Sequence, residues 1–314
     1  MSSDDLPAKD KAYFASAAST DPWIGMEIKR VCVLGAGLMG HGIAQVCAQV
    51  GKFEVNMRDI EQPFIDTGMK MINDSLQRFV KKGTMTERES QEVRGRIHPT
   101  LDLTEAVQDA DLVIEAITEN PPLKKAVLSE VDKHAPPHAI IASNTSSISI
   151  TEIGGATKRP EKVCGMHFFN PPQLMRLIEI IRGLKTSDDT VEVIKSVSTK
   201  LGKECVVVKK DTPGFIVNRI LVPALNEAVF LVEEGVADPE DIDKAVTLGL
   251  NWPMGPLKLI DYVGADTNLF ITGVMVNETG DQKFRPSTLL RQMVRGNLLG
   301  RKTGKGFYDW SEKK

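Results

Sequence analysis

The strongest constraint on this sequence is a short apolar run that leads directly into a glycine-rich turn. Residues 30–40 read R-V-C-V-L-G-A-G-L-M-G, so a G-x-G-x-x-G spacing follows a predicted strand. In such a unit Gly35 permits the tight turn, Gly37 lets the backbone approach a pyrophosphate, and Gly40 lets helix and strand pack closely. The helix that starts at Gly40 would direct its free N–H groups at the phosphates. The pattern therefore predicts a βαβ unit that binds a dinucleotide.

An acidic residue after the second predicted strand indicates which dinucleotide binds. Residues 53–57 form another strand-like run, and Asp59 lies 19 residues after Gly40, close to the usual spacing of about 20. A carboxylate there accepts hydrogen bonds from a ribose diol and repels a 2′-phosphate, which favours NAD over NADP. Two alternatives stay open, because the neighbouring Arg58 could hold a phosphate and because an aspartate here could simply end a strand.

The overall composition is that of a globular enzyme. With 314 residues, 41% of them hydrophobic and 26% charged, the chain is long enough for two domains. The net charge of −3 gives no support for a nucleic-acid or membrane surface. No apolar stretch approaches the roughly 20 residues of a membrane span. We therefore expect a protein that binds neither nucleic acid nor membrane.

The cysteines and the N-terminal segment favour a cytoplasmic location. The four cysteines lack C-x-x-C spacing, which predicts reduced thiols and neither a zinc site nor a disulfide framework. These residues are Cys32, Cys47, Cys164 and Cys205. Residues 1–26 are polar and contain aspartates, which argues against an organellar presequence. We interpret residues 1–26 as an N-terminal extension.

Apolar runs and helical patterns alternate over residues 27–212. This alternation predicts an α/β domain of Rossmann type, with a mainly parallel sheet and helices on both faces. The expected strands are 31–34, 54–57, 112–116, 139–142, 162–166, 177–181 and 205–208. The expected helices are 61–82, 86–95, 121–134 and 188–201.

A D-T-P-G sequence at 211–214 separates this region from the rest of the chain. Beyond it the strand pattern disappears, and residues 213–314 are expected to form a smaller all-helical domain. The helices expected there are 215–234, 238–249, 256–272 and 286–299. Their apolar surface exceeds what one helical layer can hide, which predicts a homodimer interface and part of a substrate cleft.

His167 is the strongest candidate for proton transfer. Of the five histidines it alone ends an apolar run and enters a Phe-Phe-Asn-Pro-Pro turn, and an imidazole suits proton exchange with an alcohol near neutral pH. Glu179, the only acid within the run 177–181, needs a partner if it is buried and could orient the ring. Alternatively, His167 is a structural histidine, and Glu179 forms an ion pair on an edge strand with Arg176 or Arg182.

Two further side chains could contact the oxygen of a substrate. Ser146 lies in the S-N-T-S-S sequence that follows the run 139–142, and Asn218 lies shortly after the D-T-P-G sequence. Parallel strands deliver such loops to the carboxyl edge of the sheet, where ligands collect. Serine and asparagine in these positions are more often helix caps or turn residues, so the structural interpretation also stays open.

Several motifs in a fixed order resemble the L-3-hydroxyacyl-CoA dehydrogenase family, especially its stand-alone 3-hydroxybutyryl-CoA dehydrogenases. The resemblance spans residues 28–310. It rests on G-A-G-L-M-G-H-G-I-A-Q from 35, I-E-A-I-T-E-N at 114–120, S-N-T-S-S at 143–147, H-F-F-N-P-P at 167–172, D-T-P-G-F-I-V-N-R at 211–219, P-M-G-P-L-K-L-I-D at 253–261 and G-R-K-T-G-K-G-F-Y-D-W at 300–310. One departure is Pro121-Pro122, which precedes Lys124 in place of more helix-friendly residues.

The resemblance implies a role for each matching position. His167 would be the general acid and base, Glu179 its partner, and Ser146 and Asn218 the contacts to the hydroxyl or keto oxygen. The positions that match NAD contacts are Gly35, Ala36, Gly37, Leu38, Met39, Gly40, Asp59, Glu119, Lys124, Ser146, Asn170 and Lys302. The positions that match coenzyme A contacts are Ser75, Lys82, Ser146 and Asn218. Without the resemblance, the basic stretch around Lys82 would be interpreted as a solvated helix face.

The implied reaction is the NAD-dependent oxidation of an (S)-3-hydroxyacyl-CoA, such as 3-hydroxybutyryl-CoA, to the 3-ketoacyl-CoA. This chemistry serves both β-oxidation and butyrate synthesis. One alternative is a dehydrogenase of a small sugar acid, as in the gulonate dehydrogenase and lens-crystallin relatives. Another is a non-catalytic relative that kept the dinucleotide-binding fold.

Overall fold

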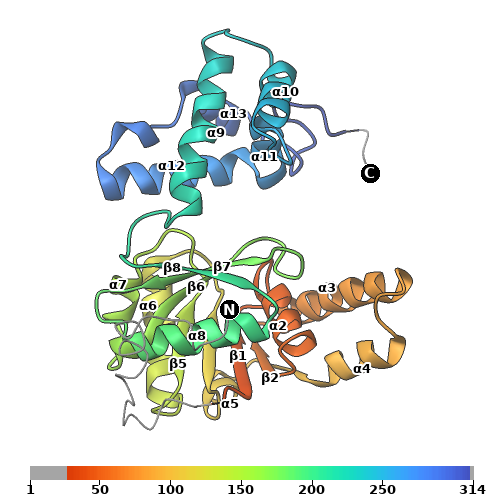
Figure 1. Ribbon diagram of the computed structural model, residues 1–314, viewed down its shortest axis with the longest axis vertical. Helices are drawn as coiled ribbons and strands as arrows, with labels where there is room; N and C mark the ends of the chain where they lie inside the picture. The colour runs from red at the N-terminus through yellow and green to blue at the C-terminus, as the bar shows by residue number, and fades with distance from the viewer. Residues whose placement is uncertain (1–26, 312–314) are drawn as a thin grey trace, which may run out of the picture.

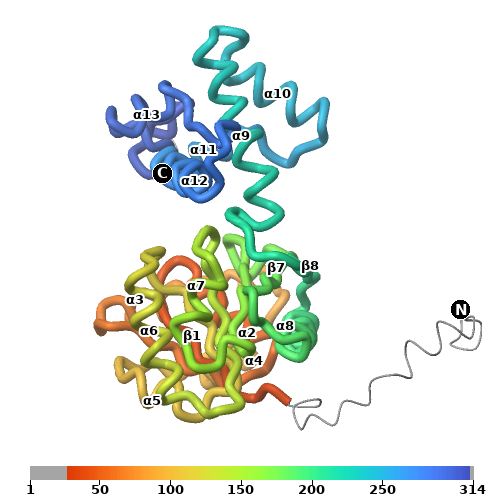
Figure 2. The backbone as a smooth tube through the Cα atoms, turned by 90° about the vertical axis from the view of Figure 1, so that its left-hand side faces the viewer, coloured from red at the N-terminus to blue at the C-terminus, as the bar shows by residue number. Residues whose placement is uncertain are grey.

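The computed structural model describes residues 27–311, and these form an α/β domain followed by a helical domain (Figures 1 and 2). The first domain is built on one eight-stranded sheet. In spatial order its strands are β3 (Ile97–Thr100), β2 (Glu54–Arg58), β1 (Arg30–Leu34), β4 (Leu112–Glu115), β5 (Ile140–Ser143), β6 (Val163–Phe168), β7 (Leu177–Arg182) and β8 (Glu204–Val208). All neighbouring strands are parallel except β6 and β7. The expected fold class is therefore confirmed.

Helices cover both faces of the sheet, and each face has its own apolar core. Side chains alternate along a strand, so Val31 and Val33 join one core while Cys32 and Leu34 join the other. The first core is closed by α2 (Gly40–Gln49), α3 (Gln62–Lys81), α4 (Glu87–Gly95) and α8 (Asp188–Lys200). The second core is closed by α5 (Leu103–Val107), α6 (Pro121–His134) and α7 (Ile150–Gly154), and a short 3₁₀ turn, η2 (Pro160–Lys162), leads into β6.

The sequence pattern missed three short elements of this domain. Strand β3 lies at the edge of the sheet and buries only Ile97, so its apolar signal is too weak to detect. Helices α5 and α7 each span five residues, too few for a helical period to emerge. Both are fixed locally by caps, since the side chains of Asp102 and Ser149 accept hydrogen bonds from backbone N–H groups in the first turn.

The helical domain packs five helices around a separate core. They are α9 (Val217–Glu233), α10 (Pro239–Gly249), α11 (Pro256–Val263), α12 (Ala265–Thr279) and α13 (Thr288–Arg295), with a 3₁₀ turn, η3 (Gln282–Phe284), before α13. Figures 1 and 2 show this domain at one end of the α/β domain, joined to it through the start of α9.

Two predictions about these helices were wrong. The expected helix 256–272 is two helices that meet at 99°, because Gly264 adopts a φ of +112° that ends α11 and starts α12. The expected helix 286–299 is shorter, since Ser287 caps α13 and the helix ends at Arg295. Within residues 27–311 no single helix has the length and apolarity to cross a membrane; only the bent pair α11 and α12 meets that test jointly.

Candidate active site

The loops after β1, β4, β5 and β6 meet at the carboxyl edge of the sheet. The strand order changes direction between β1 and β4, because the chain first adds β2 and β3 on one side and then continues on the other. Open α/β sheets bind ligands in the crevice above such a switch point. The glycine-rich turn therefore lies at the position that this fold offers to a dinucleotide.

The glycines of the turn have the constraints that the sequence predicted. Gly35 has a φ of +100°, and a Cβ atom there would lie 2.6 Å from the carbonyl oxygen of Ala116. A Cβ at Gly40 would lie 1.8 Å from the carbonyl oxygen of Gly35, so helix and turn touch backbone to backbone. At Gly37 no neighbouring atom of the described chain lies within 4 Å of a Cβ position, which leaves this backbone accessible. The turn thus fits a pyrophosphate.

Asp59 is tied to the same turn. Its Oδ2 accepts a hydrogen bond from the N–H of Ala36 at 2.7 Å, and its Oδ1 accepts one from the N–H of Ile60 at 2.7 Å. The neighbouring Arg58 donates from Nε to the carbonyl oxygen of Leu101 at 3.2 Å. The carboxylate that was expected to select NAD therefore borders the glycine turn, while the guanidinium is bonded to the chain after β3.

His167 and Glu179 form a buried pair at the end of β6. The two strands β6 and β7 are antiparallel, and their register places His167 directly opposite Glu179. His167 Nδ1 lies 2.8 Å from Glu179 Oε2, and since a carboxylate only accepts, Nδ1 carries the proton. Among residues 27–311 the other ring nitrogen, Nε2, has no hydrogen-bond partner. The ring is therefore held by one nitrogen and able to exchange a proton at the other.

The environment of Glu179 excludes the edge-strand alternative. Strand β7 lies between β6 and β8, and the carboxylate is fully buried. Its Oε1 accepts hydrogen bonds from the N–H groups of Ile216 and Val217, both at 3.0 Å. The two arginines have other partners: Arg176 pairs with Glu204 and Arg182 with Asp188.

Two aromatic rings pack against the imidazole of His167. The ring centroid of Phe169 lies 4.6 Å from that of His167, and Phe215 meets the imidazole edge-on at 5.6 Å. Phe215 precedes the N-terminus of α9, whose amides bind Glu179. Asn218 lies in the first turn of that helix, so the fold brings it toward the pair.

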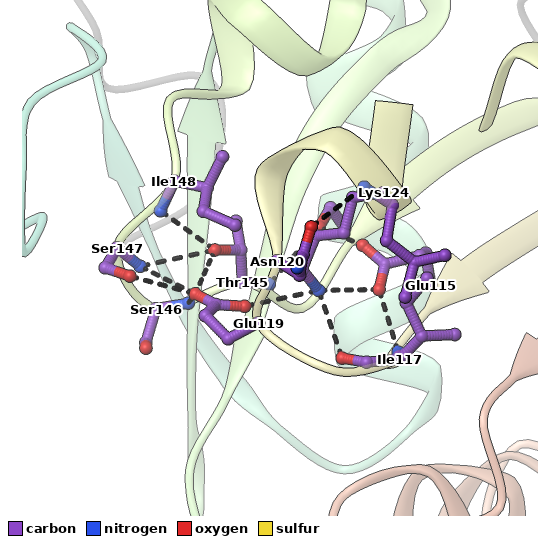
Figure 3. A network of polar contacts seen from close by, with 11 residues as sticks. Glu115, Ile117, Glu119, Asn120, Lys124, Thr145, Ser146, Ser147 and Ile148 are labelled. Atoms are coloured by element: carbon purple, nitrogen blue, oxygen red, sulfur yellow. Dashed lines mark hydrogen bonds and ion pairs between the residues drawn. The ribbon is translucent and has the colours of Figure 1, made fainter. Parts of the chain in front are cut away.

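A second polar network organises the S-N-T-S-S turn after β5 (Figure 3). Glu119 Oε1 accepts hydrogen bonds from the hydroxyl groups of Thr145 and Ser147 and from the N–H of Ser146, the last at 3.1 Å. Its Oε2 pairs with Lys124 Nζ at 3.2 Å. Burial raises the pKa of Glu119, but Lys124 and the hydroxyl donors outweigh it and hold the pKa below its ordinary value. Glu119 thus fixes the turn that carries Ser146.

Lys124 is 1% exposed and has a protein acceptor for each of its three N–H donors. Besides Glu119 these are Glu115 Oε1 at 2.6 Å and the carbonyl oxygen of Ile117 at 3.2 Å. The Pro121-Pro122 pair starts α6 after the cap Asn120, so it does not disturb the helix that carries the lysine. Lys124 therefore holds the network, with no donor left over for a ligand in this arrangement.

The remaining predicted residues lie in different places. Asn170 is exposed in the loop after β6, Ser75 is buried in α3, and Lys82 is exposed at the end of that helix. Lys302 lies in the helical domain, where it binds Asp266 at 2.8 Å and Thr267 at 3.0 Å. Hydrogen bonds and ion pairs within residues 27–311 bring His167 and Glu179 together and link Glu119, Lys124 and Ser146, but they do not join Lys302 to either group.

Sequence reasoning missed two residues that position this site. Glu115 is fully buried at the end of β4, accepts from Ser143 Oγ at 2.6 Å and pairs with Lys124. Asn144 Oδ1 accepts from the N–H of Phe168 at 2.8 Å, which fastens the β5 turn to β6 beside His167. The sequence did contain a signal for Glu115. It is an acid at the end of an apolar run, as Glu179 is an acid inside one, and a buried acid needs a partner.

Family models match nearly the whole described chain. Residues 30–212 match the 3-hydroxyacyl-CoA dehydrogenase NAD binding domain, and residues 214–310 match the C-terminal domain of the same enzymes. The chain belongs to the 3-hydroxyacyl-CoA dehydrogenase family. The cofactor of this NAD-dependent dehydrogenase is therefore NAD, and the resemblance found in the sequence is confirmed.

Curated relatives and solved structures support the stand-alone type within the 3-hydroxyacyl-CoA dehydrogenases. A probable 3-hydroxybutyryl-CoA dehydrogenase of Bacillus subtilis is 49% identical over 92% of this chain and 99% of its own. The 3-hydroxybutyryl-CoA dehydrogenase of Bradyrhizobium diazoefficiens is 46% identical over 90% of this chain and 96% of its own. The structure of (S)-3-hydroxybutyryl-CoA dehydrogenase from Ralstonia eutropha has a TM-score of 0.87 at 45% identity, covering 91% and 100% of the two chains.

Proposed function

We propose that the protein catalyses the reversible, NAD-dependent oxidation of (S)-3-hydroxybutyryl-CoA and similar short (S)-3-hydroxyacyl-CoA thioesters. The observation that carries the proposal is the buried His167–Glu179 pair with Nε2 unbonded among the described residues. The oxidation of a secondary alcohol by NAD requires a base that takes the hydroxyl proton close to the bound dinucleotide, and His167 is suited to that role.

In the proposed mechanism His167 accepts the hydroxyl proton at Nε2 while its Nδ1 proton stays hydrogen-bonded to Glu179. The carboxylate stabilises the imidazolium that forms, and its own position is fixed by the amides of Ile216 and Val217. Ser146 and Asn218 hold the substrate oxygen as it changes from hydroxyl to carbonyl. Bound NAD supplies the acceptor for the hydride that leaves C3. The reverse reduction uses the same residues, with His167 as the acid.

For the cofactor, we propose that Gly35 to Gly40 cradle the pyrophosphate and that Asp59 binds the adenine ribose. The open backbone at Gly37 and the hydrogen bond from Ala36 to Asp59 support this assignment. Glu119 and Asn170 would contact the nicotinamide half, and Lys124 would act through Glu119 because its donors are occupied. Lys302 would reach the cofactor only after leaving Asp266.

For the acyl-CoA, we propose that Ser75 and Lys82 contact the coenzyme. They lie seven residues apart along α3 and its C-terminal cap, and therefore on one side of the helix. Lys82 belongs with Arg78 and Lys81 to a basic stretch that suits phosphate groups.

We also propose a cytoplasmic homodimer assembled through the helical domain. Large apolar side chains are exposed on its helices and loops, including Leu248 at 76% and Ile220 at 68%. Light scattering at increasing protein concentration tests this proposal. A monomeric mass throughout would contradict it.

Steady-state kinetics with acetoacetyl-CoA, longer 3-ketoacyl-CoAs and the corresponding free 3-keto acids test the proposed activity, each with NADH and with NADPH. We expect turnover of the thioesters and a preference for NADH. Faster turnover of free acids would favour the sugar-acid alternative. A thermal shift with NADH but no turnover of any thioester would favour the non-catalytic one.

A further inference from the structure

Three charged side chains form a cluster beside the turn that carries Ser146, and two of the three are fully buried (Figure 3). Glu115 is fully buried, Lys124 is 1% exposed, and the side chain of Glu119 is 26% exposed. The ammonium lies 2.6 Å from Glu115 Oε1 and 3.2 Å from Glu119 Oε2. Two carboxylates facing one ammonium leave the cluster with one excess negative charge.

The neighbours of the cluster supply hydrogen bonds but no second cation among residues 27–311. Glu115 accepts from Ser143 Oγ at 2.6 Å and from the N–H of Ile117 at 2.8 Å. Glu119 accepts from two hydroxyl groups and from the N–H of Ser146. Neutral donors solvate a carboxylate without cancelling its charge, so the excess charge acts on whatever occupies the adjacent crevice.

We propose that Glu115 is a positioning residue that sets the relative affinity of the enzyme for NAD⁺ and NADH. The inference rests on the proposed function, in which Glu119 and Ser146 border the nicotinamide. The nicotinamide ring carries a positive charge in NAD⁺ and none in NADH, so a fixed negative charge nearby attracts only the oxidised form. Glu115 is fully buried and accepts hydrogen bonds from Ser143, Ile117 and Lys124. Glu115 acts through Lys124. Because the carboxylate of Glu115 offsets the positive charge of Lys124, the negative charge of Glu119 is left without a full countercharge.

The test is Glu115→Gln, which removes one charge at almost constant shape. The amide oxygen can still accept from Lys124, and the Ser143 hydroxyl can turn to accept from the amide nitrogen. Dissociation constants for NAD⁺ and NADH are measured separately by titration calorimetry, without acyl-CoA. We expect the constant for NAD⁺ to rise about 3- to 10-fold more than the constant for NADH.

The matched control is Glu152→Gln. Glu152 on α7 forms a surface ion pair with Lys125 at 2.6 Å, so the variant removes the same charge from a solvated pair near the same helix. We expect both dissociation constants of this variant to stay within about 2-fold of the parent. Circular dichroism and thermal unfolding establish that each variant is folded.

Equal changes in both constants, or no change, would overturn the inference, because a purely structural role lowers both affinities together. If Glu115→Gln does not fold, Glu119→Gln removes one negative charge from the partly exposed acid of the cluster. The ratio of the dissociation constants for NAD⁺ and NADH must then shift in the same direction. Turnover of acetoacetyl-CoA by the unaltered enzyme is measured alongside. Its absence would count against the proposed function, whereas an unshifted ratio in an active enzyme would count against this inference alone.

Discussion

Two buried carboxylates at the same edge of the sheet are used in different ways. Glu179 lies 2.8 Å from an imidazole and Glu115 lies 2.6 Å from an ammonium, and both acids are fully buried. Each also accepts hydrogen bonds from neutral donors. The difference lies in the partner, because His167 keeps a second nitrogen unbonded within residues 27–311 whereas every donor of Lys124 is occupied.

Because of this difference, the His167–Glu179 pair is suited to proton transfer, whereas the cluster of Glu115, Lys124 and Glu119 is suited to holding neighbouring groups in position. A histidine changes charge near neutral pH, and a carboxylate behind it favours the protonated ring as the reaction proceeds. A saturated lysine exchanges nothing and can only fix its neighbours. The same kind of interaction, a buried ion pair, therefore serves proton transfer between β6 and β7 and fixes the position of its neighbours between β4 and α6.

The largest effect is expected from His167→Gln. Loss of the general base should lower kcat by about 10²- to 10⁴-fold, while NADH binding stays nearly unchanged. His98→Gln is the matched control, because His98 pairs with Glu54 at the same 2.8 Å but on the exposed edge of the sheet. Stopped-flow turnover and NADH fluorescence titration measure both quantities. An unimpaired kcat would remove His167 from the mechanism.

Lys124→Met should instead act on stability. The change leaves Glu115 buried without a countercharge, which typically costs about 3–5 kcal/mol. Lys125→Met removes the neighbouring surface pair with Glu152 and should cost at most about 1 kcal/mol. Urea denaturation of both variants gives the comparison. Similar losses in the two would mean that the cluster is not held by Lys124.

Glu179→Gln sharpens the contrast between the pair and the cluster. The amide keeps a contact to His167 but no longer stabilises the positive ring, and a hydrogen bond to a charged group contributes roughly 1.5–3 kcal/mol. We therefore expect kcat to fall about 10- to 10²-fold with little change in the KM for NADH. A rise in KM at constant kcat would show that Glu179 serves binding rather than proton transfer.

Sequence patterns predicted the strands and the glycine turn of this molecule better than its helix breaks and its contacts between distant side chains. Long buried strands and the glycine turn have strong local signatures, so the sheet, the dinucleotide turn and the His167–Glu179 hypothesis could be derived from the amino-acid sequence alone. The break at Gly264 could not, because a glycine within a helical period also occurs in unbroken helices. The acceptors around Lys124 come from separate points along the chain, and only the folded chain shows that they occupy all of its donors.

The smallest expected effect concerns acid stability and tests whether the cluster stabilises Glu119 in its ionised form. The pKa of Glu119 is held below its ordinary value of 4.5, so folding favours its ionised form. Its contribution is fully present above that ordinary value and is lost as the pH falls through the lower pKa of the folded protein. The stability difference between the parent and Glu119→Gln should therefore be constant from pH 7 to about 5.5 and shrink, by on the order of 1 kcal/mol, in more acidic solution. Urea midpoints of both proteins across this range provide the measurement. A difference that stays constant down to pH values where the parent unfolds would mean that the surroundings of Glu119 hold the neutral acid as well as the charged one, so that Lys124 and the hydroxyl donors would not stabilise its carboxylate in the way that Glu179 is expected to stabilise the protonated ring of His167.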